Sequence, residues 1–453
     1  MNGELAHRVK ADRLTVPILV AYAAPSVASY FFFGTIGLYL LKFATDTLLL
    51  APALVGTIFG VARIWDAVSD PVIGFASDKT RSSLGRRRPW MLYSILPMAL
   101  FYYAIWNPAD QLQGAALSLW FGVSIFLFFT AATAFSVPHN ALGAELSQNY
   151  HERSRIYGAK ALCEQIGIIL AAVWLFQIEQ AQSPKGIAMD GAILAGGVLA
   201  LSVVWAVWKL REPDSHKGRG GSTIFASLSD VARNKNAMRL LGIFFLEMLG
   251  FHSMVVVLPY MTEYVLREPG STAYFLAAAT FSTIASIPFW VWISKRTDKA
   301  KAWRAAILIK IVVFGAMLVV GRGDSLLMGV ITFTFGIAHG ASQVLGPSLK
   351  ADVIDTDEAS SGERKEGVFF AAWNFAIKAS IGIAIVISGW MLSATGFEPG
   401  VAQSEMALTG IRALVSAAPL ICHILAIILL LKFSITVSSH TRTLERTAAN
   451  HLG

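Results

Sequence analysis

Three ionisable residues lie inside one apolar segment of this sequence, residues 52–77: Arg63, Asp66 and Asp70. Their spacing of i, i+3 and i+7 places all three on one face of a helix. Two carboxylates one turn apart repel each other, and burial in an apolar medium increases the penalty. A bound cation, a shared proton or a fixed basic partner would relieve it. The spacing indicates a cation or proton site, with a static ion pair between helices as the alternative.

Two hydroxyl side chains in the apolar segments could supply neutral oxygens to such a site. Ser69 lies between the two aspartates, and Thr133 belongs to another apolar segment, 115–140. Hydroxyl and carboxylate oxygens are ligands that suit Na⁺. Counted from Asp78 at the end of its segment, Asp66 would lie roughly 18 Å along the helix. We therefore expect the acidic pair near the middle of whatever layer the helix crosses.

A lysine in the last quarter of the chain is the candidate coupling residue. Lys378 lies within the apolar segment 367–394 and follows Trp373 and Asn374. An ammonium group can occupy the carboxylate site when the cation is absent. Two acids with a distant lysine favour an exchangeable ion over a fixed pair, and Lys378 is expected to take part in the exchange.

Further polar side chains interrupt the apolar segments and are candidates for binding a substrate. They are Tyr30, His139, Lys160, Glu164, His339, Gln343, Trp373 and Asn374. Each also has a structural interpretation: Lys160 and Glu164 are spaced i, i+4 and can pair with each other, and a histidine can be a satisfied packing residue. Glu247 and His252 could line the same cavity. Lys310 lies six residues into its segment and is expected to extend to the cytoplasmic interface.

The composition requires a membrane for these segments. The chain has 453 residues, of which 55% are hydrophobic and 15% charged, and its mean hydropathy is +0.58. Apolar segments about 20 residues long match the length that a helix needs to cross a bilayer. We predict an all-α membrane protein with twelve transmembrane helices. The predicted spans are 16–41, 52–77, 90–106, 115–140, 157–179, 189–208, 239–265, 271–293, 304–321, 326–349, 367–394 and 409–433.

The charges between these segments predict the topology and the domains. Basic residues concentrate in the loops 79–88 and 295–304 and in the central segment 209–238. By the positive-inside rule, both termini and the central segment are cytoplasmic. We expect an N-terminal six-helix bundle at 1–208, a linker at 209–238, a second bundle at 239–433 and a cytoplasmic tail at 434–453.

Several classes of protein and partner are excluded or disfavoured. The net charge of +8 falls between apolar segments and forms no stripe on a soluble domain, which argues against nucleic acid. Cys163 and Cys422 lie inside apolar segments, so we expect no disulfide framework and no cysteine metal site. No nucleophile motif is present, and we expect neither an enzyme nor a cofactor. The expected partners are a lipid bilayer and a small-molecule substrate, and the expected state is a monomer.

Several motifs resemble one known family. They are Asp66-Ala-Val-Ser-Asp70-Pro-Val-Ile-Gly74, Asp78-Lys-Thr-Arg81, Gly85-Arg-Arg-Arg-Pro-Trp90, Ala144-Glu145-Leu146 with Glu152-Arg153, and Ala351-Asp-Val-Ile-Asp355 followed by Trp373-Asn374 and Lys378. Together they resemble the glycoside–pentoside–hexuronide:cation symporters, the melibiose-permease-like branch of the major facilitator superfamily. The resemblance implies two six-helix bundles that alternate access to a central site.

The resemblance also implies roles for individual residues. Asp66, Asp70 and Thr133 match cation-site positions of the family, and Ser69 stands where melibiose permeases carry a cation-selectivity asparagine. Lys378 matches the lysine that links the cation and sugar sites, and Arg63 matches the neighbouring arginine. Asp78 and the basic residues that follow it, among them Arg81 and Arg86, match the cytoplasmic gate of the superfamily.

Two positions depart from the melibiose permeases. Their sugar-binding aspartates are Tyr30 and Ser136 here, which argues against an α-galactoside substrate. The resemblance nevertheless implies a cation-coupled symporter, driven by Na⁺ or H⁺, that imports a sugar, glycoside or uronide by alternating access. A lysolipid or an organic anion is the alternative substrate, because animal relatives in the family carry lysophospholipids. The expected location is the plasma membrane, as a bacterial inner-membrane protein.

Overall fold

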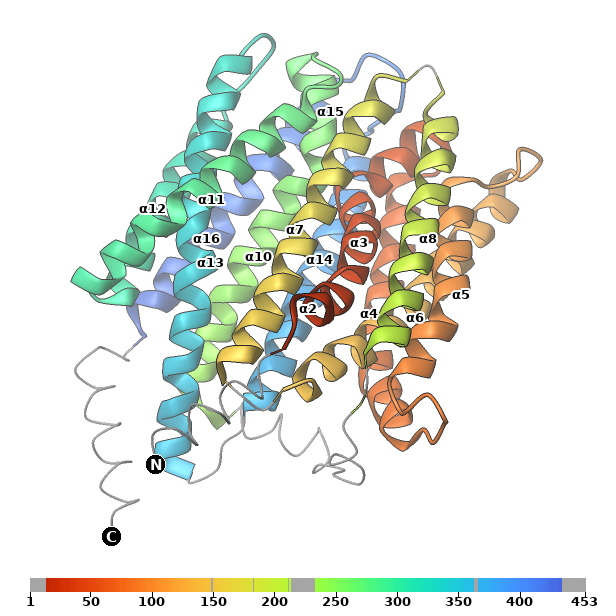
Figure 1. Cartoon of the computed structure of the whole chain (residues 1–453). Helices are drawn as coiled ribbons and strands as arrows, with labels where there is room; N and C mark the ends of the chain where they lie inside the picture. The colour runs from red at the N-terminus through yellow and green to blue at the C-terminus, as the bar shows by residue number, and fades with distance from the viewer. Residues whose placement is uncertain are drawn as a thin grey trace, which may run out of the picture. The chain divides into compact units, whose positions relative to one another are not determined.

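A computed structural model describes residues 14–147, 150–181, 183–210, 212, 233–361 and 366–433, and Figure 1 traces the chain through its helices. Most of the predicted linker, residues 211 and 213–232, lies outside the described residues, as does the predicted tail, 434–453. Throughout the described ranges the regular structure is helical.

The first half of the chain supplies six helical runs, several of them built from joined elements. In order they are α2 (Val16–Ala23) with α3 (Pro25–Lys42) and the π-helix η1 (Phe43–Thr47), α4 (Pro52–Lys79), α5 (Arg88–Trp106), α6 (Gly114–Glu145), α7 (Tyr150–Glu179) and α8 (Pro184–Lys209).

The second half supplies six more. They are α10 (Lys235–Tyr260) with the π-helix η3 (Met261–Leu266), α11 (Thr272–Arg296), α12 (Lys299–Met317), α13 (Ser325–Ser361), α14 (Glu366–Ala394), and α15 (Glu405–Arg412) with η4 (Ala413–Ala417) and α16 (Ala418–Leu431). Each of the twelve predicted segments falls on one of these runs, so the all-helical prediction is confirmed.

Nine of the described helical runs are long and apolar enough to cross a membrane. The runs outside that set are α4, α5 and α12. Two of them are rich in charge: α4 carries the acidic pair, and α12 contains four basic residues. All three still coincide with predicted spans.

Helix α4 shows how the sequence separates two faces. Large apolar side chains point outward along one stripe, at Val61, Ile64, Trp65, Val68, Val72 and Phe75. The opposite face is buried and carries Arg63, Asp66 and Ser69. Outward apolar side chains suit contact with lipid, and ionisable side chains belong on the interior face because lipid cannot solvate them. The helical period thus directs the charged residues inward.

The described chain forms two compact units. The first comprises Met1–Leu40 and Ile58–Gly221, and the second comprises Leu41–Thr57 and Ser222–Gly453. The short segment 41–57 comes from the first half of the sequence but packs within the second unit. The predicted bundle boundaries at 208 and 239 stay predictions. The sequence analysis did not predict that segment 41–57 would pack within the second unit.

Close backbone contact fixes part of that segment in the second unit. A methyl group on Gly389 of α14 would lie 2.3 Å from the Pro52 carbonyl oxygen and 3.1 Å from Gly56 Cα. Next to this contact, Trp390 Nε1 donates a hydrogen bond to Thr57 Oγ1 at 3.1 Å. Only glycine allows α4 and α14 to approach so closely.

The interior of the second unit is dominated by large apolar residues. Trp303 of α12 is fully buried at its centre, with Leu240 of α10 and Leu345 of α13 around it. Contacts among α10, α12, α13 and α16 therefore set the framework on which the polar residues of this unit are held.

Candidate functional site

The ionisable residues of α4 form a buried cluster in the first unit. Arg63 Nη1 donates to Asp66 Oδ2 at 3.1 Å, and the two side chains are only 9% and 4% exposed. The Arg63 guanidinium also lies 4.7 Å from the Phe129 ring centre of α6. Asp70 is one turn further along α4 and half-buried. The cluster thus contains two acids and one base.

Hydroxyl groups surround the carboxylate of Asp66. Thr133 Oγ1 of α6 donates to Asp66 Oδ1 at 2.7 Å. Ser69 Oγ donates to the Asp66 carbonyl at 3.1 Å and lies 3.4 Å from Thr133 Oγ1. Both hydroxyls are buried. The structure therefore brings together the carboxylate and the two neutral oxygens that the sequence pattern suggested as ligands.

A proline follows the second aspartate directly. Pro71 lies inside α4 and has no N–H to donate to the carbonyl of Ala67, four residues earlier. A carbonyl released in this way, on the residue directly after Asp66, is a further oxygen acceptor beside the cluster. Helix breaks of this kind beside charged groups are tolerated in membrane proteins where the backbone lines a site and not lipid.

The charge of the cluster determines what it can do. The Arg63–Asp66 pair is buried, and Asp70 places a second carboxylate one helical turn away. At 4 Å, opposite unit charges attract by about 4 kcal/mol at an effective dielectric constant of 20. A cation or a proton that enters can therefore be held strongly, and it can leave without breaking a covalent bond.

Three of the predicted substrate residues meet in the first unit. Lys160 and Glu164 of α7 form an ion pair and are 14% and 17% exposed. The Lys160 ammonium lies 5.6 Å from the ring centre of Tyr30 on α3. The arrangement presents an aromatic ring, a cation and an anion together, which is a suitable set for hydroxyl-rich ligands.

His139 lies elsewhere in this unit and is buried. Its Nε2 is 2.8 Å from the Tyr22 carbonyl oxygen, and its ring stacks on Phe135 at 5.1 Å. The contacts explain its burial as packing between α2 and α6. Its role as a substrate ligand stays a prediction.

The predicted residues of the second unit fall into two places. On α14, Trp373 is buried, Asn374 is exposed and Lys378 is half-buried one turn later. Trp373 packs on Phe244 at 4.6 Å and lines a small pocket, with the Lys350 ammonium 5.0 Å from its ring centre. Trp373 is thus a packing residue on one side and a pocket wall on the other.

His339 and Gln343 form the second place, on α13. Gln343 Nε2 and His339 Nε2 are 2.9 Å apart. The His339 ring is stacked 4.8 Å from Phe251 and 5.4 Å from Phe335. Gln343 is exposed, whereas His339 is 6% exposed. A glutamine held at the edge of an aromatic stack can offer its amide to a ligand.

The expectation for Lys310 was wrong. Lys310 does not reach an interface: its ammonium is buried on α12 and lies 2.7 Å from Glu247 of α10, with exposures of 1% and 0%. Ser342 accepts from Lys310 at 2.8 Å, and Trp303 Nε1 donates to Glu247 Oε2 at 3.0 Å. The partner lies 63 residues away in the chain, so no local pattern could reveal it. The sequence did not predict this sealed ion pair.

Two of the predicted gate residues, Asp78 and Arg86, lie in an ionic cluster at the ends of α4, α5 and α6. Asp78 pairs with Arg87, and Glu145 accepts from Arg86 at 3.0 Å and from Arg87 at 3.2 Å. Arg87 and Glu145 were not predicted as gate residues, although both belong to the motifs that carry the family resemblance. Arg81 is exposed.

A glutamate from the start of the linker completes this cluster. The Glu212 carboxylate accepts from the backbone N–H groups of Arg86, Arg87 and Arg88, at 2.6, 2.8 and 3.0 Å. These are the unsatisfied donors at the beginning of α5, where a negative charge is favoured. Gly85 makes the approach possible, because it has φ +105° and a side chain there would overlap the Glu212 carboxylate.

Comparison with known proteins identifies the family to which the chain is similar. Residues 21–437 match the family described as MFS/sugar transport protein. The chain is 25% identical over 449 residues to the inner membrane symporter YicJ of Escherichia coli, covering 97% of this chain and 96% of YicJ.

Two further relatives have names that specify different cargo. The isoprimeverose transporter of Lactiplantibacillus pentosus is 26% identical, covering 86% of this chain and 83% of the relative. The sodium-dependent lysophosphatidylcholine symporter 1-A of Danio rerio is also 26% identical, covering 93% and 86%.

Solved structures share the fold at low identity. A bacterial homologue of the human lysosomal transporter Spinster matches with a TM-score of 0.66 and 14% identity, over 95% of this chain and 97% of the homologue. The nucleoside transporter NupG matches with a TM-score of 0.64 and 12% identity, over 92% and 98%. These similarities concern the fold alone.

Proposed function

Because the chain belongs to the MFS/sugar transport protein family, we propose that it imports a sugar, glycoside or uronide in symport with Na⁺ or H⁺ by alternating access. It is an MFS-type symporter and a multi-pass membrane transporter, and its family and structural neighbours are transporters, not enzymes. The identity of the ion, the substrate and the direction of transport belong to the proposal.

The observation that supports ion coupling is the pair of acids on α4. Asp66 is buried and receives hydrogen bonds from Arg63 and Thr133, and Asp70 adds a second carboxylate one turn away. Two carboxylates this close repel each other when both are ionised, and the repulsion is stronger in a buried site. A monovalent cation or a proton that binds there relieves the repulsion, and its binding energy favours one conformation over the other.

Lys378 is proposed as the residue that replaces the ion when the carrier returns empty. It is half-buried within α14, where a permanently charged group is costly unless it serves a function. If the ammonium neutralises the acids in the empty state and retreats in the loaded state, the carrier can return without leaking ions. Coupling of the two sites is then reciprocal, so ion and substrate each raise the affinity for the other.

Polar side chains in each unit are proposed as candidates for binding the substrate. Tyr30 with the Lys160–Glu164 pair offers an aromatic face and charged hydrogen-bonding groups. Gln343, beside His339, offers an amide. Sugars are commonly bound by such combinations of flat rings and fixed polar groups, and these residues support a polyhydroxylated substrate.

A lysolipid or organic anion is the second candidate. Tyr30 and Ser136 stand where the melibiose permeases bind galactosyl groups through acids. Loss of both acids removes repulsion toward an anionic substrate. Relatives named as lysophosphatidylcholine symporters have the same degree of identity as the sugar transporter, about a quarter.

Uptake into proteoliposomes tests the coupling. Purified protein would be screened for thermal stabilisation by sugars, uronides and lysolipids, with and without Na⁺. The stabilising compound would then be followed under an inward Na⁺ gradient or an inward H⁺ gradient. We expect accumulation above equilibrium with one gradient and none with Asp66→Asn, whereas Asp190→Asn, an exposed acid on α8, should transport normally. Equal accumulation with and without ion gradients would contradict the proposal.

We also propose that both termini face the cytoplasm, as the loop charges suggest. Cysteines placed at Lys185 or Arg322 should react with an impermeant reagent added outside intact cells. A cysteine at Lys301, exposed at the other end of the helices, should react only after the membrane is permeabilised. Labelling of the Lys301 position in intact cells would reverse the orientation.

A further inference from the structure

Three side chains form a stripe along α13 in the second unit. Phe335, His339 and Gln343 are spaced four residues apart, so they lie on one face of the helix. Phe335 is 1% exposed, His339 is 6% exposed, and Gln343 is exposed. The stripe therefore runs from the core of the unit to its surface and ends on an amide group.

Helix α10 places an aromatic ring against this stripe. The ring of Phe251 is half-buried and lies nearly parallel to the ring of His339, at an angle of 15° and 4.8 Å between centres. It is also parallel to the ring of Phe335, at 5° and 6.1 Å. The imidazole of His339 is thus held by aromatic packing below the Gln343 amide.

The other side of α13 packs closely on α11. A methyl group on Gly336 would lie only 2.2 Å from the Ala279 carbonyl oxygen, so glycine permits the two backbones to approach. Next to this contact, the Ile337 carbonyl accepts a hydrogen bond from Trp290 Nε1 at 2.7 Å. The stripe is therefore carried by a helix that is fixed in place, as a preorganised binding site requires.

The contact between His339 and Gln343 determines which way the amide faces. The two Nε2 atoms are 2.9 Å apart. Since an amide NH₂ group only donates, the imidazole Nε2 accepts and carries no proton. The ring of His339 is then neutral, with its proton on Nδ1. Gln343 keeps one N–H and its carbonyl oxygen for a ligand.

These groups are complementary to part of a sugar. Of two neighbouring hydroxyl groups, one can accept from the free amide N–H while the other donates to the amide oxygen. The C–H face of a sugar ring can pack on a flat aromatic surface such as Phe251. Gln343, Phe251 and the neutral His339 carry no full charge, so they offer nothing to balance an anionic group.

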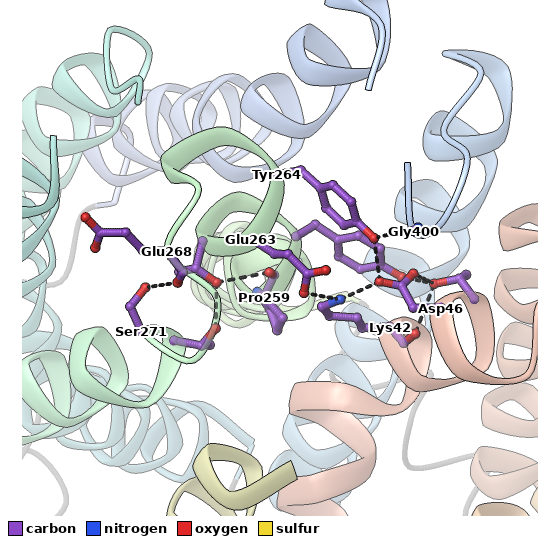
Figure 2. Close-up of polar contacts among 12 residues, drawn as sticks. Lys42, Asp46, Pro259, Glu263, Tyr264, Glu268, Ser271 and Gly400 are labelled. Carbon is purple, nitrogen blue, oxygen red and sulfur yellow. Dashed lines mark hydrogen bonds and ion pairs between the residues drawn. The ribbon is translucent and has the colours of Figure 1, made fainter. Parts of the chain in front are cut away.

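Two buried ammonium groups of the same unit are held by acids of the protein. Lys42 pairs with Asp46 and lies 2.7 Å from the Glu263 carboxylate (Figure 2). Lys310 lies 2.7 Å from the carboxylate of Glu247. Neither ammonium group is left to bind an anionic ligand.

We propose that Gln343 and Phe251 bind two adjacent hydroxyl groups and the C–H face of an uncharged sugar, and that His339 is a positioning residue that holds the Gln343 amide. This inference rests on the proposed function and narrows its substrate class to a neutral sugar or glycoside. An amide that the histidine already holds need not be ordered when the ligand binds, which lowers the cost of binding.

The substrate class can be tested with paired probes on the purified full-length protein. Methyl glycosides of glucose, galactose and xylose would be compared with methyl glucuronide and lysophosphatidylcholine, in Na⁺ buffer and in Na⁺-free acidic buffer. We expect thermal stabilisation by at least one neutral glycoside and less by the uronide. Stabilisation by the uronide or the lysolipid alone, or by none of these probes, would overturn the inference.

Titration of the stabilising glycoside then tests the amide. Gln343→Leu should raise its dissociation constant about thirty-fold, the effect of losing two hydrogen bonds. Gln111→Leu makes the same chemical change at an exposed loop residue of the first unit and should leave the constant unchanged. Equal affinity in wild-type and Gln343→Leu protein would contradict the assignment of the amide.

Two substitutions of His339 separate positioning from packing. His339→Phe keeps a ring stacked on Phe251 but removes the acceptor, so binding should weaken about five-fold, because the amide loses rotamer entropy on binding, while the melting temperature changes little. His339→Gln keeps an acceptor but removes the ring, so the melting temperature should fall while binding is retained. Binding that follows the melting temperature in both variants would show that His339 only packs.

Uptake into proteoliposomes distinguishes failure of this inference from failure of the proposed function. A glycoside that binds through Gln343 but is not accumulated under any ion gradient would refute symport and keep the binding site. A glycoside that wild-type and Gln343→Leu protein accumulate equally well would support symport and overturn the binding site.

Discussion

Both units contain buried charged side chains, but the charged groups are paired differently in each. In the first unit, Arg63 faces two acids, and the acid that it contacts also receives a hydroxyl bond from Thr133. In the second unit, Lys310 faces a single acid, Glu247, and both are sealed from solvent. The first cluster places two acids beside one arginine on α4, and the second joins one acid to one lysine. A one-to-one pair favours a permanent bond, whereas a second acid close by favours an exchangeable cation.

This comparison predicts opposite results from removing one acid. Asp66→Asn turns the first cluster into one acid and one base, so the protein should remain folded while ion-driven accumulation falls to the level of empty liposomes. Thermal unfolding and uptake should be measured on the same preparation. Accumulation by Asp66→Asn protein at the wild-type level would remove the cation site from α4.

In the sealed pair, removing the acid should damage the fold. Glu247→Gln leaves the Lys310 ammonium buried without its counter-charge, and we expect a loss of about 3–5 kcal/mol in the free energy of unfolding. The double change Glu247→Leu with Lys310→Met should recover most of that loss, because it removes both charges. Lys299→Met, in a pair that is 30% exposed at the lysine, is the control and should change stability by less than about 1 kcal/mol. Recovered transport in the double variant would establish that this pair is structural.

The third prediction concerns Lys378, the lysine proposed to exchange with the ion. Lys378→Ala should uncouple transport, lowering ion-driven accumulation about ten-fold, the typical size of a coupling energy, with little change in thermal stability. Lys432→Ala, an exposed lysine after α16, should be neutral. A fall in transport only in step with lost stability would identify Lys378 as a second structural charge, like Lys310.

The smallest effect is expected from the neutral oxygens. Thr133→Val removes one hydroxyl from Asp66 and should weaken ion binding about five-fold, which corresponds to about 1 kcal/mol, the net contribution of a typical hydrogen bond. Thr130→Val makes the same change one turn earlier on α6, where the hydroxyl accepts from Trp65 at 2.8 Å. Ion titration of substrate binding would compare the two. Equal affinities would place the ion away from Thr133.

The sequence predicted what depends on local periodicity. Segment length predicted the positions of the twelve helices, and the structure confirms them. Helical spacing predicted a shared face for Arg63, Asp66 and Asp70; the first two are buried on α4, and Asp70 is half-buried. Thr133 could be proposed only through its residue type and the family resemblance, because its distance from Asp66 depends on how α4 and α6 pack.

Interactions between distant segments could not be predicted in this way. Lys310 pairs with Glu247 of α10, and the Glu212 carboxylate accepts hydrogen bonds from N–H groups at the start of α5, about 125 residues earlier in the chain. The sequence around each residue does not indicate its partner. The π-helical segments η1 and η3 were also not predicted. A π-turn adds one residue to a single helical turn, and the spacing of apolar residues in so short a segment does not show that addition.

The glycine contact between α4 and α14 has a thermodynamic consequence. Gly56 and Gly389 meet through backbone atoms, so no side chain there must adopt a fixed rotamer when the surfaces join. Ordering a long side chain costs up to about 2 kcal/mol of conformational entropy, and glycine has none to lose. The contact between α4 and α14 can therefore form and break with only a small change in side-chain entropy. The free energy of separating the two helices near Gly56 and Gly389 then depends mainly on the polar groups of neighbouring helices.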